Sequence, residues 1–131
     1  MKKDDRIFVA GHKGLVGSAI VRTLKDRGYK RIVTKTRQEC DLLNPLDVKK
    51  LFEENRIDYV FDAAARVGGI HANDTYSAEF IYENTMIQTN LIHYAYKYFV
   101  KKFCFLGSVC IYPKFAPTPV KEESILCGEL E

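Results

Sequence analysis

The sequence predicts an α/β protein built on a doubly wound parallel sheet. Two observations lead to this prediction: short apolar runs alternate with longer segments of helical periodicity, and a glycine-rich loop joins the first apolar run to the first helical segment. Apolar residues make up 47% of the 131 residues and charged residues 28%, which is the balance of a water-soluble globular domain.

The first strand and helix span residues 6–28. Arg6–Ala10 is almost wholly apolar, which is typical of a strand buried on both faces of a parallel sheet. Residues of one helix face then recur at helical spacing from Val16 to Arg27, most of them apolar, and Gly28 follows where a left-handed residue ends a helix.

Two more strands are expected over Arg31–Thr36 and Asp58–Ala65. Between them, Asn44 is a predicted N-cap followed by a proline at the first helical position, so a helix is expected over Pro45–Asn55. Residues 63–69, Ala-Ala-Ala-Arg-Val-Gly-Gly, follow the second of these strands with small side chains that allow a ligand close to the backbone.

The last predicted elements are a long helix over Ala78–Tyr98 and a strand over Lys102–Gly107. Ile111–Glu131 contains three prolines and no clear periodicity, so a loop is expected there. Alternation of strand and helix implies parallel pairing through crossover connections. We expect an incomplete sheet that lacks later strands.

Charge and cysteine usage exclude several classes of protein. The 20 basic and 17 acidic residues are spread along the chain, so neither a nucleic-acid partner nor a membrane is expected. Cysteines at positions 40, 104, 110 and 127 form no CxxC pair, and no signal peptide or long apolar span is visible. We therefore expect a cytoplasmic protein with free thiols and no metal site, in which Cys104 is a buried small hydrophobe.

The loop Gly11-x-x-Gly14-x-x-Gly17 lies between a predicted strand and a predicted helix, which is the context of a Rossmann-type dinucleotide site. The first glycine permits a tight turn, the second admits the diphosphate, and the third lets the helix pack closely on the strand. The alternative is that these glycines mark only a turn.

The cofactor is predicted from the residues after the second strand. An NAD site usually has an acidic residue there, whereas this chain has Lys35, Thr36 and Arg37. Lys13 and Arg37 can flank a 2′-phosphate, which favours NADP, unless both are merely solvated surface charges. Asp41 and Leu42 are expected at the adenine end. The predicted cofactor contacts are Gly11, His12, Lys13, Gly14, Leu15, Val16, Gly17, Arg37, Asp41, Leu42, Ala63, Ala64, Ala65, Leu106 and Gly107.

Four segments together resemble the GDP-L-fucose synthases, which are extended short-chain dehydrogenases/reductases. These segments are residues 11–20, residues 63–70, residues 80–84 and residues 106–114 of sequence Leu-Gly-Ser-Val-Cys-Ile-Tyr-Pro-Lys. The resemblance implies 3,5-epimerisation of GDP-4-keto-6-deoxy-D-mannose followed by NADPH-dependent reduction at carbon 4. It further implies that Ser108 binds the ketone oxygen and that Cys110 is an acid/base in the epimerisation. Without the resemblance, Ser108 would be interpreted as a turn cap.

The resemblance also implies parts that are not visible in residues 1–131. The Tyr-x-x-x-Lys pair of the superfamily is expected beyond Glu131, together with the catalytic histidine and the GDP-sugar domain; Tyr98 and Lys102 match the spacing only by coincidence. Residues 1–131 are thus expected to be the N-terminal part of an NADP-binding domain, inactive alone and dimeric in the full enzyme. A GDP-deoxy-sugar or GDP-heptose 4-reductase without epimerase activity, and a non-catalytic NADP-binding domain, stay open as alternatives.

Overall fold

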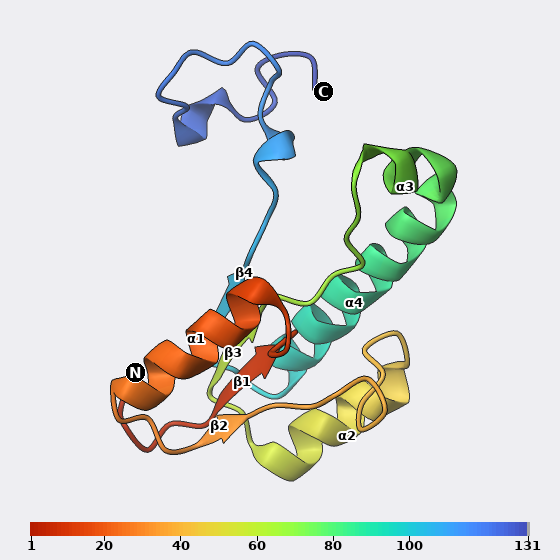
Figure 1. Ribbon diagram of the computed structural model, residues 1–131. Coiled ribbons are helices and arrows are strands. Elements are labelled where there is room, and N and C mark those ends of the chain that lie inside the picture. Colours follow the sequence, from red (N-terminus) through yellow and green to blue (C-terminus); the bar gives the residue numbers. More distant parts are fainter. Residues whose placement is uncertain (131) are drawn as a thin grey trace.

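Four parallel strands form one sheet with helices on both faces in the computed structural model, which describes residues 1–130 (Figure 1). The strands are β1 (Ile7–Ala10), β2 (Ile32–Val33), β3 (Tyr59–Asp62) and β4 (Lys102–Phe105), in the order β2-β1-β3-β4. Helix α1 (Leu15–Asp26) packs on one face, and α2 (Pro45–Asn55) and α4 (Ser77–Lys97) pack on the other. The predicted α/β fold class is confirmed.

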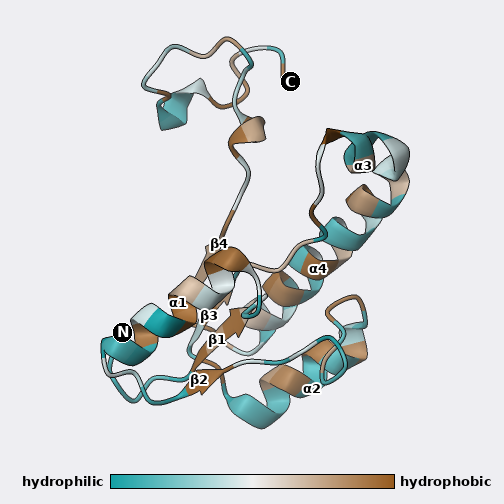
Figure 2. Ribbon diagram, in the orientation of Figure 1, coloured by the Kyte–Doolittle hydropathy of each residue, from teal (hydrophilic) through white to brown (hydrophobic). Residues whose placement is uncertain are grey.

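The central strand β1 is buried along its whole length because both faces of the sheet are covered. Ile7 and Val9 pack with Leu24 of α1, whereas Phe8 packs with residues of α2 and α4. All four residues of β1 are at most 1% exposed. Hydrophobic residues accordingly concentrate in the strands, and polar residues lie on the outer faces of the helices (Figure 2).

The strand order reverses between β1 and β3. From β1 the chain passes through α1 to β2 on one side, and from β2 it returns through α2 to β3 on the other side of β1. Such a switch point leaves a crevice beyond the carboxyl ends of the two strands, where ligands of doubly wound sheets bind. The segments that follow β1 and β3 therefore line any site at this edge.

The residues predicted to end α1 and to begin α2 make the expected capping contacts. Gly28 follows α1 with φ of +79°, and the Tyr29 N–H donates to the Leu24 carbonyl at 3.0 Å, which is the pattern of a Schellman motif. The Asn44 side chain accepts from the Leu46 N–H at 3.0 Å, directly before Pro45 begins α2. These signals placed α2 at its observed bounds.

Three predicted strands end earlier than expected. Strand β4 ends at Phe105 instead of Gly107, and hydrogen-bonded turns follow β2 and β3. Strand β2 covers only Ile32–Val33, and a turn begins at Thr36, whose carbonyl accepts from the N–H groups of Glu39 and Cys40, both at 3.0 Å. Strand β3 ends at Asp62, whose carboxylate accepts from the Ala64 N–H at 3.1 Å. In both segments a turn begins where the prediction continued the strand.

Three further differences concern the second half of the chain. The six-residue helix α3 (Ile70–Thr75) was not predicted, and the predicted C-terminal loop contains the short 3₁₀ turns Val109–Ile111 and Glu122–Ser124. The prediction that Cys104 is buried was wrong. Cys104 pairs in register with Phe61 on the α1 side of the edge strand β4, which α1 does not reach, so the thiol is only half-buried.

No helix within residues 1–130 combines the length and the apolar character needed to cross a membrane.

The glycine loop packs backbone against backbone. A Cβ atom at Gly17 would lie 2.2 Å from the Gly11 carbonyl oxygen, and a Cβ atom at Gly11 would lie 2.3 Å from the Ala63 carbonyl oxygen. Gly11 also has φ of +70°. By contrast, a Cβ atom at Gly28 would meet nothing within 4 Å. Gly11 and Gly17 thus close the junction of β1, α1 and β3, whereas Gly28 has only a conformational role.

We expect Gly17→Ala to lower the free energy of unfolding by roughly 2–3 kcal/mol, because backbone must shift to admit the methyl group. Gly28→Ala should cost only about 1 kcal/mol, since its penalty is the left-handed conformation alone. Denaturant unfolding of the two variants beside the wild type measures both values. Equal losses would contradict the packing role of Gly17.

Candidate functional site

A cleft of about 890 Å³ opens at the switch point, between the segments that follow β1, β2 and β3. Twelve of the predicted cofactor contacts line it: Gly11, His12, Lys13, Gly14, Leu15, Val16, Arg37, Asp41, Leu42, Ala63, Ala64 and Ala65. These twelve residues lie as much as 54 positions apart in the sequence, from Gly11 to Ala65, and the cleft brings them together. Gly17 lies behind this wall, buried against the Gly11 carbonyl.

The N-terminus of α1 faces this cleft without a side-chain cap. Its N-cap residue is Gly14, no acidic residue occupies the first turn, and no side chain accepts from the free N–H groups there. Leu15 and Val16 are 89% and 51% exposed. Free N–H groups and the positive end of the helix dipole together form a site suited to a diphosphate.

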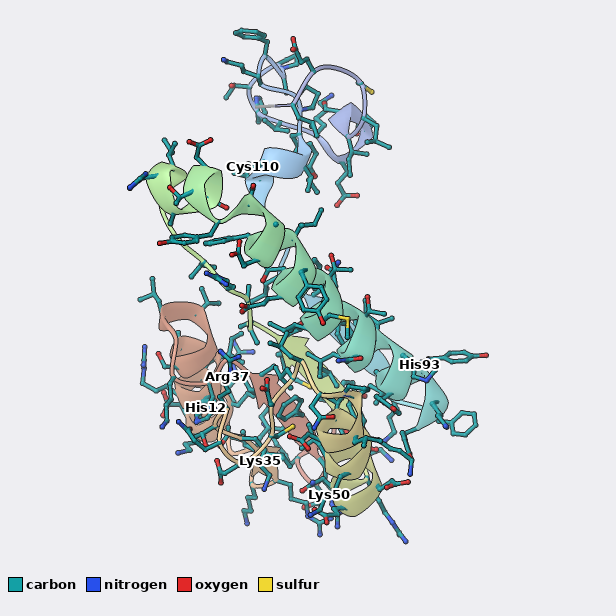
Figure 3. The ribbon with its side chains drawn as sticks, turned by 90° about the vertical axis from the view of Figure 1, so that its right-hand side faces the viewer. His12, Lys35, Arg37, Lys50, His93 and Cys110 are labelled. Carbon is teal, nitrogen blue, oxygen red and sulfur yellow. The ribbon has the colours of Figure 1, made fainter. Side chains whose placement is uncertain are left out.

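Basic side chains gather at one end of the cleft. Lys13 belongs to the glycine loop, and Lys35 and Arg37 belong to the turn after β2. Figure 3 shows His12, Lys35 and Arg37 at the same end of the molecule. The Arg37 side chain is 67% exposed and lies 3.7 Å from the Asp41 carboxylate, so its guanidinium is accessible to a ligand. This end can hold an anion such as a phosphate on a ribose.

The next part of the wall is apolar and firmly held. The buried Asn90 side chain of α4 donates to the Leu42 carbonyl at 2.9 Å and thereby fixes the segment after the turn. Cys40 lies beside it, 4% exposed, and burial raises the pKa of its thiol to about 11. Cys40 is therefore an uncharged thiol in a surface suited to a planar apolar group such as adenine.

The segment after β3 forms the opposite wall, and α4 holds it in place. Asn84 accepts from the Arg66 N–H at 2.7 Å and donates to the Arg66 carbonyl at 3.0 Å. The Arg66 guanidinium bonds Glu83 at 2.6 Å and lies 4.9 Å from the centre of the Phe80 ring. These contacts stretch across 18 positions of sequence and fix the course of the segment after Ala65.

Several residues that line the cleft were missed by sequence reasoning. They are Lys35, Thr36, Gln38, Cys40, Leu43, Arg66, Val67, Glu83 and Ile87. Lys35 and Thr36 directly precede the predicted Arg37, so their proximity in the sequence could have indicated that they line the cleft. Glu83 and Ile87 come from the middle of α4, and no local pattern distinguishes them from other residues of that helix.

The structure does not bring four of the predicted residues to the cleft. Leu106 and Gly107 leave the end of β4, and Ser108 and Cys110 follow on an exposed segment that extends away from the sheet. In Figure 3 Cys110 lies at the opposite end of the molecule from His12 and Arg37. Leu106 and Gly107 thus do not line this cleft. They follow the edge strand β4, whereas the switch point lies between β1 and β3.

Ser108 is the N-cap of the 3₁₀ turn Val109–Ile111, and its hydroxyl oxygen accepts from the Cys110 N–H at 3.2 Å. Ser108 thus caps a turn, which is the role expected of it without the resemblance to the GDP-L-fucose synthases. An accepting hydroxyl still has its own proton to donate, so both roles are compatible.

Tyr98 and Lys102 do not form a catalytic pair. The Tyr98 hydroxyl donates to the Glu53 carboxylate of α2 at 2.8 Å, and its ring lies 6.1 Å from the ring of Phe52. Lys102 begins β4, whereas Ser108 follows the end of that strand, so the two lie at opposite ends of β4. Tyr98 is a packing residue.

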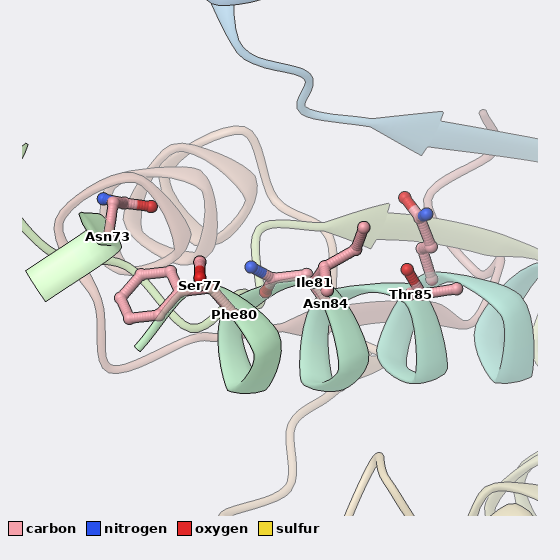
Figure 4. A pocket seen from close by; sticks show the side chains of 7 residues that line it. Asn73, Ser77, Phe80, Ile81, Asn84 and Thr85 are labelled. Carbon is pink, nitrogen blue, oxygen red and sulfur yellow. The ribbon is translucent and has the colours of Figure 1, made fainter. Parts of the chain in front are cut away.

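A second, shallower hollow of about 320 Å³ runs along α4 (Figure 4). Its lining residues are Asn73, Ser77, Phe80, Ile81, Asn84, Thr85 and Gln88. The Asn84 amide is already bonded to the Arg66 backbone, and no cationic side chain lines this hollow. Among residues 1–130, no cluster of His, Cys, Asp and Glu side chains could hold a metal ion. The cleft at the switch point is therefore the candidate site.

Asp62 is a buried acidic residue at the edge of this cleft. It ends β3 and is 2% exposed, and its Oδ1 atom accepts from the Ala64 N–H at 3.1 Å. Its Oδ2 atom has no hydrogen-bond partner among the residues described. Burial raises the pKa of the carboxyl from 3.8 to about 6, although the bond from Ala64 opposes that shift.

The raised pKa predicts that stability falls as pH rises. Between pH 4 and 6 the folded state binds the Asp62 proton and the unfolded state does not, so the contribution of Asp62 to the free energy of unfolding decreases by about 3 kcal/mol across this window. Asp62→Asn should remove this decrease. Urea unfolding at pH 4, 5, 6 and 7 measures it, with the exposed Asp74→Asn as a matched control. Parallel profiles for wild type and Asp62→Asn would contradict the assignment.

Comparison with known proteins gives a consistent family. The chain is 56% identical over 131 residues to a putative GDP-L-fucose synthase 2 of Arabidopsis thaliana, matching 100% of this chain and 40% of that protein. It is 53% identical over 126 residues to the GDP-L-fucose synthase of Escherichia coli strain K12, matching 96% and 39% of the two chains. The chain thus spans about 40% of the length of these relatives.

Solved structures agree with this comparison. A GDP-mannoheptose C4 reductase from Campylobacter jejuni with NADP bound superimposes with a TM-score of 0.93 and 46% identity, over 100% of this chain and 39% of that one. The model of the NAD dependent epimerase/dehydratase family matches residues 7–130, which include all four strands and the whole cleft. The chain belongs to the NAD dependent epimerase/dehydratase family.

Proposed function

We propose that this chain supplies the cofactor-binding half of an NADPH-dependent epimerase/reductase that converts GDP-4-keto-6-deoxy-D-mannose to GDP-L-fucose. The observation on which the proposal depends is the cleft at the switch point, where an uncapped helix N-terminus and a cationic end lie together. A diphosphate fits the first feature and a 2′-phosphate fits the second.

The residues of the cleft fit NADP(H) in three parts. The N–H groups at the start of α1 would hold the diphosphate, and the close approach of Gly11 to Ala63 leaves that space free of side chains. Lys13 and Arg37 would hold the 2′-phosphate, and the wall that includes Leu42 would receive the adenine. When bound, NADPH supplies the hydride that reduces the ketone.

Two further residues of this chain are proposed to act on the sugar. The Ser108 hydroxyl, which accepts from the Cys110 N–H, keeps its proton to donate to a ketone oxygen and to stabilise the negative charge that develops on it. The exposed Cys110 thiol is proposed to exchange protons at carbons 3 and 5, which the neighbouring ketone acidifies. The resemblance of residues 106–114 to the GDP-L-fucose synthases supports both roles.

A GDP-heptose 4-reductase without epimerase activity is the second candidate. It is supported by the 46% identity to the GDP-mannoheptose C4 reductase, compared with 56% and 53% to the two GDP-L-fucose synthases. Both candidates require the same cofactor cleft, so the cleft supports the reductase step in each, and epimerisation distinguishes them.

Arg37→Ala should weaken binding of NADPH about tenfold or more while NADH binding changes little, because the guanidinium bonds only the 2′-phosphate. Fluorescence titration with both cofactors measures the two dissociation constants. Lys50→Ala, a change of an exposed cation on α2 outside the cleft, is the matched control. An equal loss for NADPH and NADH would overturn the assignment of Arg37.

Solvent deuterium tests the epimerase step. A GDP-4-keto-6-deoxy-D-mannose substrate processed in D₂O by the complete enzyme should give GDP-L-fucose labelled at carbons 3 and 5, since each inversion returns a solvent proton. Mass spectrometry of the product measures the label, and Cys110→Ser should abolish most of it. A reduced product without deuterium would favour the 4-reductase.

A further inference from the structure

The turn after β2 displays Arg37 toward the cleft, and Glu39 closes this turn. One carboxylate oxygen of Glu39, Oε2, accepts from the Thr36 N–H at 2.7 Å and from the Thr36 hydroxyl at 2.8 Å. The Thr36 carbonyl in turn accepts from the Glu39 N–H at 3.0 Å. Three hydrogen bonds thus join residues 36 and 39 and leave Arg37 and Gln38 at the exposed corner between them.

These bonds lie just beyond β2, which ends at Val33. The Glu39 carboxylate accepts from the Thr36 N–H, so this N–H group is not available to a longer strand. The hydrogen bonds from Thr36 hold the pKa of the Glu39 carboxyl below its ordinary value of 4.5, and the nearby charges of Lys35 and His12 act in the same direction. Glu39 is therefore charged at neutral pH, which strengthens both bonds.

We propose that Glu39 is a positioning residue that holds the Thr36–Glu39 turn so that Arg37 faces the 2′-phosphate of the dinucleotide. This inference rests on the proposed NADP(H) function and extends it to the preference for the phosphorylated cofactor. An arginine on an unconstrained loop would have to be ordered when the ligand binds, whereas a closed turn presents it beforehand.

Positioning by Glu39 and the electrostatic effect of its charge change the affinity for a 2′-phosphate in opposite directions. Glu39 places a negative charge among the cations that would receive a 2′-phosphate, so its removal by charge alone would tighten binding of that phosphate. If Glu39 acts by positioning Arg37, its removal weakens binding instead. The direction of the change therefore distinguishes the two roles.

Calorimetric titration with 2′,5′-ADP and 5′-AMP, which differ in the 2′-phosphate, tests the proposal. Glu39→Ala should weaken 2′,5′-ADP binding about fivefold and change 5′-AMP binding less than twofold. Glu39→Gln should keep most of the affinity, because an amide oxygen still accepts from Thr36. The control is Glu54→Ala, which removes an exposed carboxylate of α2 that lies 3.8 Å from Lys50.

The outcomes separate this inference from the proposed function. If wild type binds the two probes equally, or if Arg37→Ala leaves 2′,5′-ADP binding unchanged, the NADP(H) function itself fails. If Arg37→Ala weakens 2′,5′-ADP binding but Glu39→Ala leaves it unchanged or tightens it, only the role of Glu39 is overturned. Should Glu39→Ala not fold, Thr36→Val removes one of the two bonds to the carboxylate and is expected to weaken 2′,5′-ADP binding about twofold.

Discussion

Backbone meets backbone at Gly11, and the geometry of both the fold and the cleft depends on this contact. The carbonyl of Gly11 lies where a side chain of residue 17 would be. The α-carbon of Gly11 in turn lies against the carbonyl of Ala63. Any side chain at positions 11 or 17 would push α1 away from β1 or β3. The same contact brings the free N–H groups of α1 to the edge of the sheet, so packing and anion binding have one cause.

The cleft divides into regions that are held by different forces. The apolar wall is held from behind by α2 and α4, through buried contacts and the bond from Asn90 to Leu42. The opposite wall is held by polar contacts between Arg66 and α4. At the cationic end, Arg37 lies in a turn that hydrogen bonds between Thr36 and Glu39 hold, and its side chain is largely in solvent, so hydrogen bonds contribute more than packing to the geometry of this turn.

Most of the fold followed from local sequence signals. The apolar run of β1, the Asn44-Pro45 start of α2 and the Gly28 end of α1 each have a local physical cause, and each prediction was confirmed. Two of the errors, the lengths of β2 and β3, lie where a side chain bonds a backbone N–H group just past the strand. Glu39 accepts from Thr36 after β2 and Asp62 accepts from Ala64 after β3, and hydrophobic periodicity contains no information about such bonds.

The sequence by itself determined the fold class, the glycine loop and the identity of the cations beside it, because these depend on neighbouring residues and on short fixed spacings. Only the tertiary structure decided which distant residues share the cleft. Glu83 and Ile87 reach it because α4 packs across the end of β3, and the segment with Ser108 and Cys110 stays apart because it leaves an edge strand. The glycine loop predicts that a nucleotide site exists, whereas its walls are set by contacts between residues far apart in the chain.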